Sequence, residues 1–180
     1  MGNGHIQILD KSFKLYIKQE RIDSKVKELA EQISTNFQGK ELFIISILNG
    51  AFIFTADLIK ALKIDCPISF VKLSSYNGVN RNEQIKELIG LDDNLKGKHV
   101  LIVEDIIDSG NTILQIKEQI LAQNPSSISI ATLLLKPDAL EYNVKIDYIG
   151  FEVGNEFLVG YGLDYNAYGR GLKDIYQNMK

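Results

Sequence analysis

Short, uninterrupted runs of Ile, Leu and Val recur along the chain, and they limit the fold more than any other feature of the sequence. In most of these runs apolar and polar residues do not alternate, which is typical of strands that other elements cover on both faces. The runs, each taken as a strand, are Leu42–Leu48, Ile68–Leu73, His99–Glu104, Ile128–Leu135, Asp147–Phe151 and Phe157–Tyr161.

The stretches between these runs carry apolar residues at helical spacing. Asp23–Phe37 places its apolar residues on one stripe, and Ala51–Leu62 and Thr112–Ala122 repeat the pattern. Strands that alternate with helices are joined by right-handed crossovers into a parallel sheet. We therefore predict an α/β fold in which helices flank a central, mainly parallel sheet. No pattern assigns an element to the last stretch, Lys173–Lys180.

The length and composition of the chain are those of one globular domain. Its 180 residues are enough to enclose a sizeable core, and 45% of them are apolar, which disfavours a disordered or fibrous protein. No internal repeat and no linker rich in Pro or Gly divides the sequence. We predict a single domain over residues 1–180.

Charge and cysteine content bear on partners and compartment. The net charge is −3 and no dense stripe of Lys or Arg occurs, so a general nucleic-acid binder is disfavoured. Cys66 is the only cysteine, which excludes an internal disulfide and a cysteine-based zinc site. The sequence shows no secretory signal and no apolar run of membrane-spanning length. We therefore expect a reduced, cytoplasmic protein that has neither nucleic acid nor membrane as a partner.

A polar segment of weak periodicity extends over about residues 74–98. Loops of this length are uncommon in a compact α/β domain unless they act as a lid or a binding loop. The modestly apolar Ile85–Ile89 is a candidate for one arm of a hairpin inside it. The alternative interpretation is a disordered surface excursion.

The run that begins at His99 ends in two acidic residues, Glu104 and Asp105, and a third, Asp108, follows three residues later. In an open α/β sheet, ligands bind beyond the carboxyl ends of the strands. Carboxylates at such an end accept hydrogen bonds from sugar hydroxyls or hold Mg²⁺ through oxygen ligands. The small-residue turn Ser109–Thr112 then opens a helix, whose free N–H groups and dipole favour a phosphate. This combination predicts a nucleotide or sugar-phosphate site.

Other interpretations of this segment stay open on residue chemistry alone. Asp108 or Ser109 could simply cap the helix, with Glu104 and Asp105 as solvated charges. Among phosphate-binding folds, neither G-x-x-x-x-G-K-[ST] nor G-x-G-x-x-G occurs, which disfavours a P-loop nucleotidase and a dinucleotide-binding Rossmann site. A response-regulator receiver would need a conventional five-fold βα repeat, which the C-terminal part does not supply.

The segment Val100–Thr112 resembles the phosphoribosyl pyrophosphate-binding signature of type I phosphoribosyltransferases, and its E-D-I-I-D-S-G form resembles the hypoxanthine-guanine branch of that family. Three further segments match the same branch in the same order, so the resemblance extends from about Leu42 to Leu172. It implies the type I phosphoribosyltransferase fold, with a small hood formed by the N- and C-terminal segments, and Mg²⁺ as cofactor. The phosphoribosyl pyrophosphate-binding residues that it implies are Glu104, Asp105, Asp108, Ser109, Gly110, Asn111 and Thr112.

The first of the further segments is the turn Ile47–Gly50. The resemblance implies that its backbone N–H groups bind pyrophosphate and that the peptide before Asn49 is cis. Many relatives carry Lys where Asn49 stands. Without the family, a plain Asn-Gly turn would be the default interpretation. The pyrophosphate-binding residues that the resemblance implies are Leu48, Asn49, Gly50, Ser75, Tyr76 and Arg170.

The second segment, Lys72–Tyr76, resembles the mobile catalytic loop of the family, whose Ser-Tyr pair closes over pyrophosphate and excludes water. Tyr76 alone could equally be a surface aromatic. Arg170 aligns with the pyrophosphate-contacting Arg of relatives, although Gly169 stands where they usually carry an aromatic residue.

The third segment implies the purine site. Lys136 matches the residue that donates to the 6-oxo group of the base, a contact that separates hypoxanthine and guanine from adenine. Phe157 would stack on the base, and the backbone carbonyls of Leu158 and Asp164 would contact its N1/N2 edge. The metal ligands implied are Glu104, Asp105 and, for a second Mg²⁺, Asp164. For Phe157 and Tyr161, alternating core packing in a strand remains the alternative.

The resemblance implies transfer of the 5-phosphoribosyl group from phosphoribosyl pyrophosphate to N9 of hypoxanthine or guanine, with Asp108 as the general base at N7. The products would be IMP or GMP and pyrophosphate, and the protein would be a homodimer or homotetramer. Three rivals stay open: a phosphoribosyltransferase for another base such as xanthine, adenine or a pyrimidine, a non-catalytic RNA-binding regulator of the same fold, and a binding protein without activity. The charge balance and the intact acidic residues oppose the last two.

Overall fold

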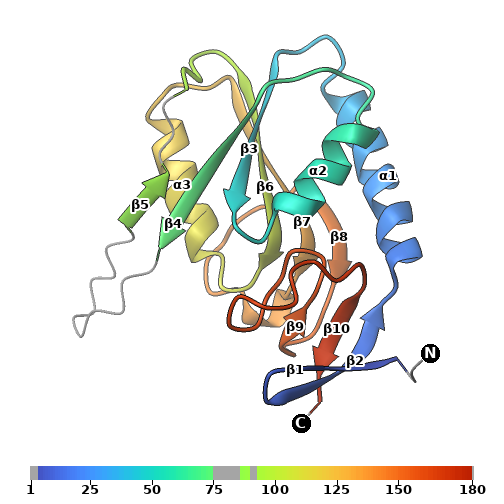
Figure 1. Cartoon of the computed structure of the whole chain (residues 1–180). Helices are drawn as coiled ribbons and strands as arrows, with labels where there is room; N and C mark the ends of the chain where they lie inside the picture. The colour runs from blue at the N-terminus through green and yellow to red at the C-terminus, as the bar shows by residue number, and fades with distance from the viewer. Residues whose placement is uncertain (1–3, 75–85, 90–92, 180) are drawn as a thin grey trace.

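A six-stranded sheet forms the centre of the molecule, in the order β5–β4–β3–β6–β7–β8 (Figure 1). This computed structural model describes residues 4–74, 86–89 and 93–179, and the count of strands refers to them. All neighbouring pairs are parallel except β4 and β5, so the predicted mainly parallel sheet is confirmed. The strands are β3 (Leu42–Leu48), β4 (Ile68–Ser74), β5 (Lys86–Ile89), β6 (His99–Ile107), β7 (Ser127–Leu135) and β8 (Tyr148–Glu152).

Helices cover both faces of this sheet, which explains why its strands are apolar throughout. Figure 1 shows α1 (Gln19–Asn36) and α2 (Phe52–Ala61) on one side and α3 (Asn111–Leu121) on the other. Successive side chains of a strand point to opposite faces. In β6, Leu101 accordingly packs in the cluster with α1 and α2, while its neighbour Ile102 packs in the cluster with α3. None of the helices in the described part of the chain is long and apolar enough to cross a membrane.

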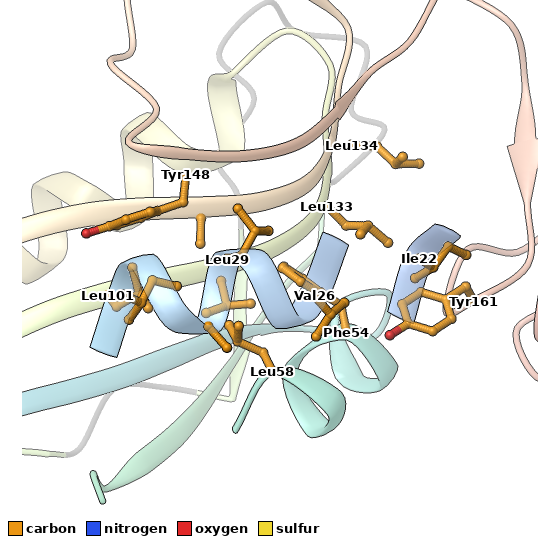
Figure 2. Packing of buried hydrophobic residues seen from close by; sticks show 14 of the residues in the cluster. Ile22, Val26, Leu29, Phe54, Leu58, Leu101, Leu133, Leu134, Tyr148 and Tyr161 are labelled. Carbon is orange, nitrogen blue, oxygen red and sulfur yellow. The ribbon is translucent and has the colours of Figure 1, made fainter. Parts of the chain in front are cut away.

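Residues from α1, α2 and the central strands form the larger of the two buried clusters. Val26 and Leu29 of α1 and Phe54 and Leu58 of α2 meet Leu133 of β7 there (Figure 2). Because α1 presents its apolar residues at helical spacing, one face of the helix is buried and the opposite face is exposed. The helix that the sequence predicts at Asp23–Phe37 therefore exists, and it begins four residues earlier.

The prediction for β6 was wrong at its carboxyl end. The strand was predicted to stop at Glu104, but it continues to Ile107, because Ile106 and Ile107 still pair with Leu134 and Leu135 of β7. Glu104 and Asp105 therefore lie within a strand rather than beyond it. Polar residues in the sequence did not end the strand, because its pairing partner β7 remains apolar to its last residue.

A second, antiparallel sheet forms the predicted hood below the carboxyl ends of the parallel strands (Figure 1). Its order is β1–β2–β10–β9, so both terminal parts of the chain contribute to it. Lys173–Lys180, to which the sequence assigned no element, contains the strand β10 that pairs with both β2 and β9. The strands are β1 (His5–Ile8), β2 (Lys11–Ile17), β9 (Leu158–Val159) and β10 (Ile175–Asn178).

The strand predicted at Phe157–Tyr161 is reduced to β9, which belongs to the hood. The extended backbone ends after Val159 because Gly160, Tyr161 and Gly162 all have positive φ angles of 102°, 49° and 104°. This prediction was therefore wrong in length. The hairpin arm predicted within residues 74–98 is confirmed as β5, which pairs antiparallel with β4.

Candidate active site

Two adjacent carboxylates of β6, Glu104 and Asp105, are buried at 7% and 8% exposure. The backbone N–H of Asp105 donates to Glu104 Oε1 at 3.1 Å. Burial raises the pKa of both carboxyls, and the charge of Asp105 raises the pKa of Glu104 further. Arg170 lies near enough for its positive charge to lower the pKa of Asp105 in part. A buried acid pair of this kind is expected where a protein binds a cation or a polar ligand.

The turn after β3 lies directly against this acid pair. A Cβ on Gly50 would overlap the carboxylate of Asp105, so only glycine fits at this position without movement. The peptide between Leu48 and Asn49 is cis, as the resemblance implied. A Cβ on Gly162 would in turn overlap the carbonyl oxygen of Gly50. The backbone of three segments distant in the sequence therefore converges beside Asp105.

The turn between β6 and α3 surrounds a small cavity. Gly110 is the N-cap of α3, with φ 88°, and the side chains of Asp108 and Ser109 therefore do not occupy the capping position. The carbonyl of Ser109 accepts the N–H groups of Glu141 and Tyr142, which holds the turn in place. The cavity has a volume of about 90 Å³ and opens at the start of a helix, a position that favours an anion. It is lined by Glu104, Ile106, Ile107, Asp108, Ser109, Gly110, Thr112 and Ile113.

Asp108 and Lys136 form an ion pair at the ends of neighbouring strands. Lys136 Nζ lies 3.0 Å from Asp108 Oδ2. The lysine side chain is only 12% exposed, whereas that of Asp108 is 59% exposed. Lys136 is held at its backbone, since its N–H donates to the carbonyl of Ile107 at 3.0 Å. The structure thus places a cationic donor and an anionic acceptor side by side at the edge of the turn between β6 and α3, the phosphate-type turn.

Phe157 stands in the hood and is 44% exposed. It packs against Phe13 and Tyr165, at centroid distances of 6.4 and 5.8 Å. Lys11 Nζ lies 5.3 Å from the centroid of the Phe157 ring, a cation–π contact that sequence reasoning did not anticipate. The neighbouring Leu158 is buried in β9. An exposed ring held in this way offers a stacking surface for a flat ligand.

Arg170 and Asp164 bind each other within the loop that follows β9. The guanidinium of Arg170 lies 2.6 Å from Asp164 Oδ1 and donates to the carbonyl of Gly162 at 2.6 Å. In the described ranges, no three side chains of His, Cys, Asp or Glu are grouped so that they could hold one metal ion. Asp164 therefore does not join Glu104 and Asp105 in a common cluster.

The structure joins Asp105 to Gly50 and Asp108 to Lys136, whereas the contacts of Phe157 lie within the hood. Two of the predicted residues lie outside the described part of the chain. Ser75 and Tyr76, predicted to contact pyrophosphate, fall among the residues that are not described. Tyr161 is buried, which confirms the interpretation that it packs in the core. Sequence reasoning missed the role of Gly162 as a close neighbour of Gly50, because no local pattern reveals an approach between two loops.

This site and fold define a class of proteins. The family described as phosphoribosyl transferase domain matches residues 16–166, and the chain belongs to this phosphoribosyltransferase family. A hypoxanthine phosphoribosyltransferase from Buchnera aphidicola is 41% identical over 86% of this chain and 89% of its own. A hypoxanthine-guanine phosphoribosyltransferase from Aquifex aeolicus is 38% identical over 94% and 97%. Among solved structures, a hypoxanthine-guanine phosphoribosyltransferase from Bacillus anthracis superposes with a TM-score of 0.86 at 38% identity, covering 93% and 97%.

We expect Gly50→Ala to lower the free energy of unfolding by about 2 kcal/mol or more, the range of overpacking in a tight site. The added Cβ would overlap the Asp105 carboxylate and displace either this side chain or the turn. Urea denaturation followed by circular dichroism measures the change. Gly171→Ala is the control, because a Cβ there meets nothing within 4 Å and the variant should unfold like the wild type. Equal stability of the two variants would contradict the close approach.

We also expect Glu104→Gln to raise the melting temperature of the metal-free protein, and to raise it more at pH 8 than at pH 5. A carboxyl whose pKa is raised by folding binds more protons in the folded than in the unfolded state. Its contribution to stability is therefore lost as the pH rises above the ordinary value of 4.5. Differential scanning calorimetry in a chelating buffer measures the difference.

The control for this prediction is Glu31→Gln. Glu31 is exposed, and Lys63 at 2.9 Å lowers its pKa, so that its replacement should not raise the melting temperature. A gap between Glu104→Gln and the wild type that does not widen with pH would refute the assignment of a raised pKa to the buried pair.

Proposed function

We propose that this protein transfers the 5-phosphoribosyl group of phosphoribosyl pyrophosphate to N9 of hypoxanthine or guanine, with release of pyrophosphate, in purine salvage. The observation that carries the proposal is the ion pair of Asp108 and Lys136 at the edge of the cavity at the start of α3. The similar proteins from Buchnera aphidicola and Aquifex aeolicus carry hypoxanthine or hypoxanthine-guanine phosphoribosyltransferase as their names. The chain would act as one domain over residues 1–180.

The donor would bind along the carboxyl end of β6. Its 5′-phosphate would occupy the turn Asp108–Thr112, where the cavity, the helix start and the hydroxyl groups suit an anion. The hydroxyl groups of its ribose would reach Glu104 and Asp105. Pyrophosphate would lie on the backbone of the turn at Leu48, Asn49 and Gly50, since Asn49 supplies no charge of its own.

The acid pair fits Mg²⁺ as the cofactor. Glu104 and Asp105 offer oxygen ligands, which this ion prefers, and their shared burial leaves a charge that a divalent cation would offset. When bound, Mg²⁺ neutralises the charge of the leaving pyrophosphate. Asp164 is engaged by Arg170, and a second Mg²⁺ beside Asp164 stays a prediction. Pyrophosphate contacts of Arg170, Ser75 and Tyr76 also stay predictions.

The purine would use the pair of Asp108 and Lys136. In a 6-oxopurine, O6 and N7 are neighbouring atoms on one edge of the base. The ammonium of Lys136 would donate to O6 while the carboxylate of Asp108 lies at N7, which fits their separation of 3.0 Å. An adenine amino group would leave the mostly buried Lys136 without an acceptor, and this would disfavour adenine. Phe157 would stack on the base, and the carbonyls of Leu158 and Asp164 would receive its N1/N2 donors.

In the reaction, the bond from C1′ to pyrophosphate stretches, and positive charge develops on the ribose as in glycoside hydrolysis. N9 of the base attacks C1′ while Asp108 accepts the proton at N7. Lys136 fixes the orientation of the base at O6. Little activation of the nucleophile is needed, because the donors around pyrophosphate stabilise the leaving group.

The rival within enzymes is a phosphoribosyltransferase for another base, such as xanthine. The non-catalytic RNA-binding regulator is not favoured, because the buried acid pair is intact and the net charge is −3. The cytoplasmic location and the homodimer or homotetramer remain predictions.

A spectrophotometric assay tests the proposal. The protein is given phosphoribosyl pyrophosphate and Mg²⁺, with hypoxanthine, guanine, xanthine, adenine and uracil offered separately. We expect conversion of hypoxanthine or guanine, and its loss when the metal is chelated. Turnover of adenine or uracil alone would keep the donor site and reject the role of Lys136. Folded protein that converts no base would reject the proposal.

We expect Asp108→Asn to lower kcat by about 10²- to 10⁴-fold, the usual contribution of a general base. The KM for phosphoribosyl pyrophosphate should change much less than kcat, because the backbone N–H groups and hydroxyls of the turn that would hold the 5′-phosphate remain in place. Steady-state kinetics with hypoxanthine measure both constants. Asp138→Asn is the matched control, since Asp138 is an exposed carboxylate two residues after Lys136 and should be replaceable. Wild-type turnover in Asp108→Asn would show that the base is another group.

A further inference from the structure

Tyr161 is a buried tyrosine that joins the hood to the body of the molecule. Its ring lies beside Ile22 and Phe54 at one end of the larger core cluster, with its hydroxyl oxygen directed to α2 (Figure 2). There the hydroxyl donates to Asp57 Oδ2 at 2.8 Å. Burial raises the pKa of this phenol, and so does its hydrogen bond to Asp57, so the hydroxyl is a neutral donor at neutral pH. A phenylalanine would fill the same space, and the hydroxyl therefore serves the contact with Asp57.

The loop that contains Tyr161 is held together by its own hydrogen bonds. The N–H of Tyr161 donates to the carbonyl of Leu172 at 2.8 Å, and the N–H of Gly162 to that of Arg170 at 2.9 Å. The guanidinium of Arg170 donates to the carbonyl of Gly162 and forms an ion pair with Asp164. These bonds fix the shape of the loop, and its contacts with the body fix its position.

Two of those contacts lie on the same short stretch of chain. Gly162 packs on the carbonyl oxygen of Gly50, and Tyr161 binds Asp57 seven residues further along. Gly50 belongs to the turn proposed for pyrophosphate, and α2 begins two residues after it. Gly50 in turn packs on Asp105. A continuous series of contacts thus runs from Asp57 through the loop to the acid pair.

We propose that Tyr161 and Asp57 are positioning residues of the transfer reaction. Their hydrogen bond fixes the loop to α2 and keeps Gly162 seated on Gly50, so that the purine contacts and the pyrophosphate turn stay aligned. Neither side chain touches a substrate in this arrangement. The inference rests on the proposed function, because it assigns the two ends of the loop to the base and to pyrophosphate.

Asp57 is suited to this role because its carboxylate is only partly withdrawn from solvent. It also pairs with Lys60 at 3.3 Å and lines a cavity of about 290 Å³ between α1 and α2. Its charge is therefore compensated, and it strengthens the bond from the tyrosine without the cost of an isolated buried ion. Removal of the hydroxyl should release the loop while the fold persists.

The test compares three ligands in Tyr161→Phe. We expect the KM for hypoxanthine and the inhibition constant of inorganic pyrophosphate to rise about five- to tenfold, the effect of one ordinary hydrogen bond. The inhibition constant of ribose 5-phosphate should stay within about twofold, since this ligand would use the turn Asp108–Thr112 on the other side of the acid pair. A merely structural role would lower the melting temperature and leave the ratio of the two inhibition constants unchanged.

Variants at Asp57 and a second tyrosine complete the design. Asp57→Asn keeps an acceptor for the hydroxyl and should behave almost like the wild type, whereas Asp57→Ala should reproduce Tyr161→Phe. The double variant Tyr161→Phe/Asp57→Ala should have nearly the same constants as either single variant, because both substitutions remove the same interaction. Tyr176→Phe is the control, since its hydroxyl donates to Asp174 at 3.2 Å within the hood.

The outcomes separate this inference from the proposed function. A wild type that converts no base rejects the proposed function. If the wild type is active, the decisive quantity is the inhibition constant of pyrophosphate divided by that of ribose 5-phosphate. The same value of this ratio in Tyr161→Phe and in the wild type rejects the positioning role and leaves the proposed function intact. If Asp57→Ala does not fold, the contrast between Tyr161→Phe and Asp57→Asn decides, and equal kinetics of these two variants also reject it.

Discussion

The buried acid pair of β6 is the constraint on which the arrangement of the site depends. Glu104 and Asp105 are withdrawn from water inside a strand whose other residues build the core. Two like charges in such surroundings destabilise the protein unless donors or a cation offset them. The neighbouring segments are arranged accordingly, since Gly50 leaves room for one carboxylate and Arg170 brings positive charge near it. The buried acid pair thus lowers the stability of the folded protein and in return provides a binding site for a charged ligand.

The other parts of the site are positioned around this pair by contacts between distant segments. On one side, the ends of β6 and β7 bring Asp108 beside Lys136, because parallel strands in register end at the same edge. On the other side, the loop that follows β9 contacts the turn after β3 through Gly162 and contacts α2 through Tyr161. A phosphate, a base and a metal could therefore be held together only after the sheet and the hood have both formed.

Much of the fold follows from local patterns, and each wrong prediction has a physical cause that can be named. The continuous apolar run Leu42–Leu48 is a strand with those bounds, because a strand covered on both faces needs no polar positions. The end of β6 was misplaced because partners across the sheet, rather than its own polarity, extend it to Ile107. The run Phe157–Tyr161 was read as one strand, although the glycines after Val159 turn the backbone. The strand β10 is short and mixed in polarity, so no pattern could reveal it.

The sequence by itself determined the alternation of strands and helices, the phosphate-type turn after β6 and the family to which the chain belongs. These features depend on the order of residues over short distances, which a sequence records directly. Only the tertiary structure decided that Asp108 pairs with Lys136, that Glu104 and Asp105 are buried and that Tyr161 binds Asp57. Such contacts join residues far apart in the chain. Their geometry depends on how the sheet, the helices and the hood pack, and no local pattern encodes it.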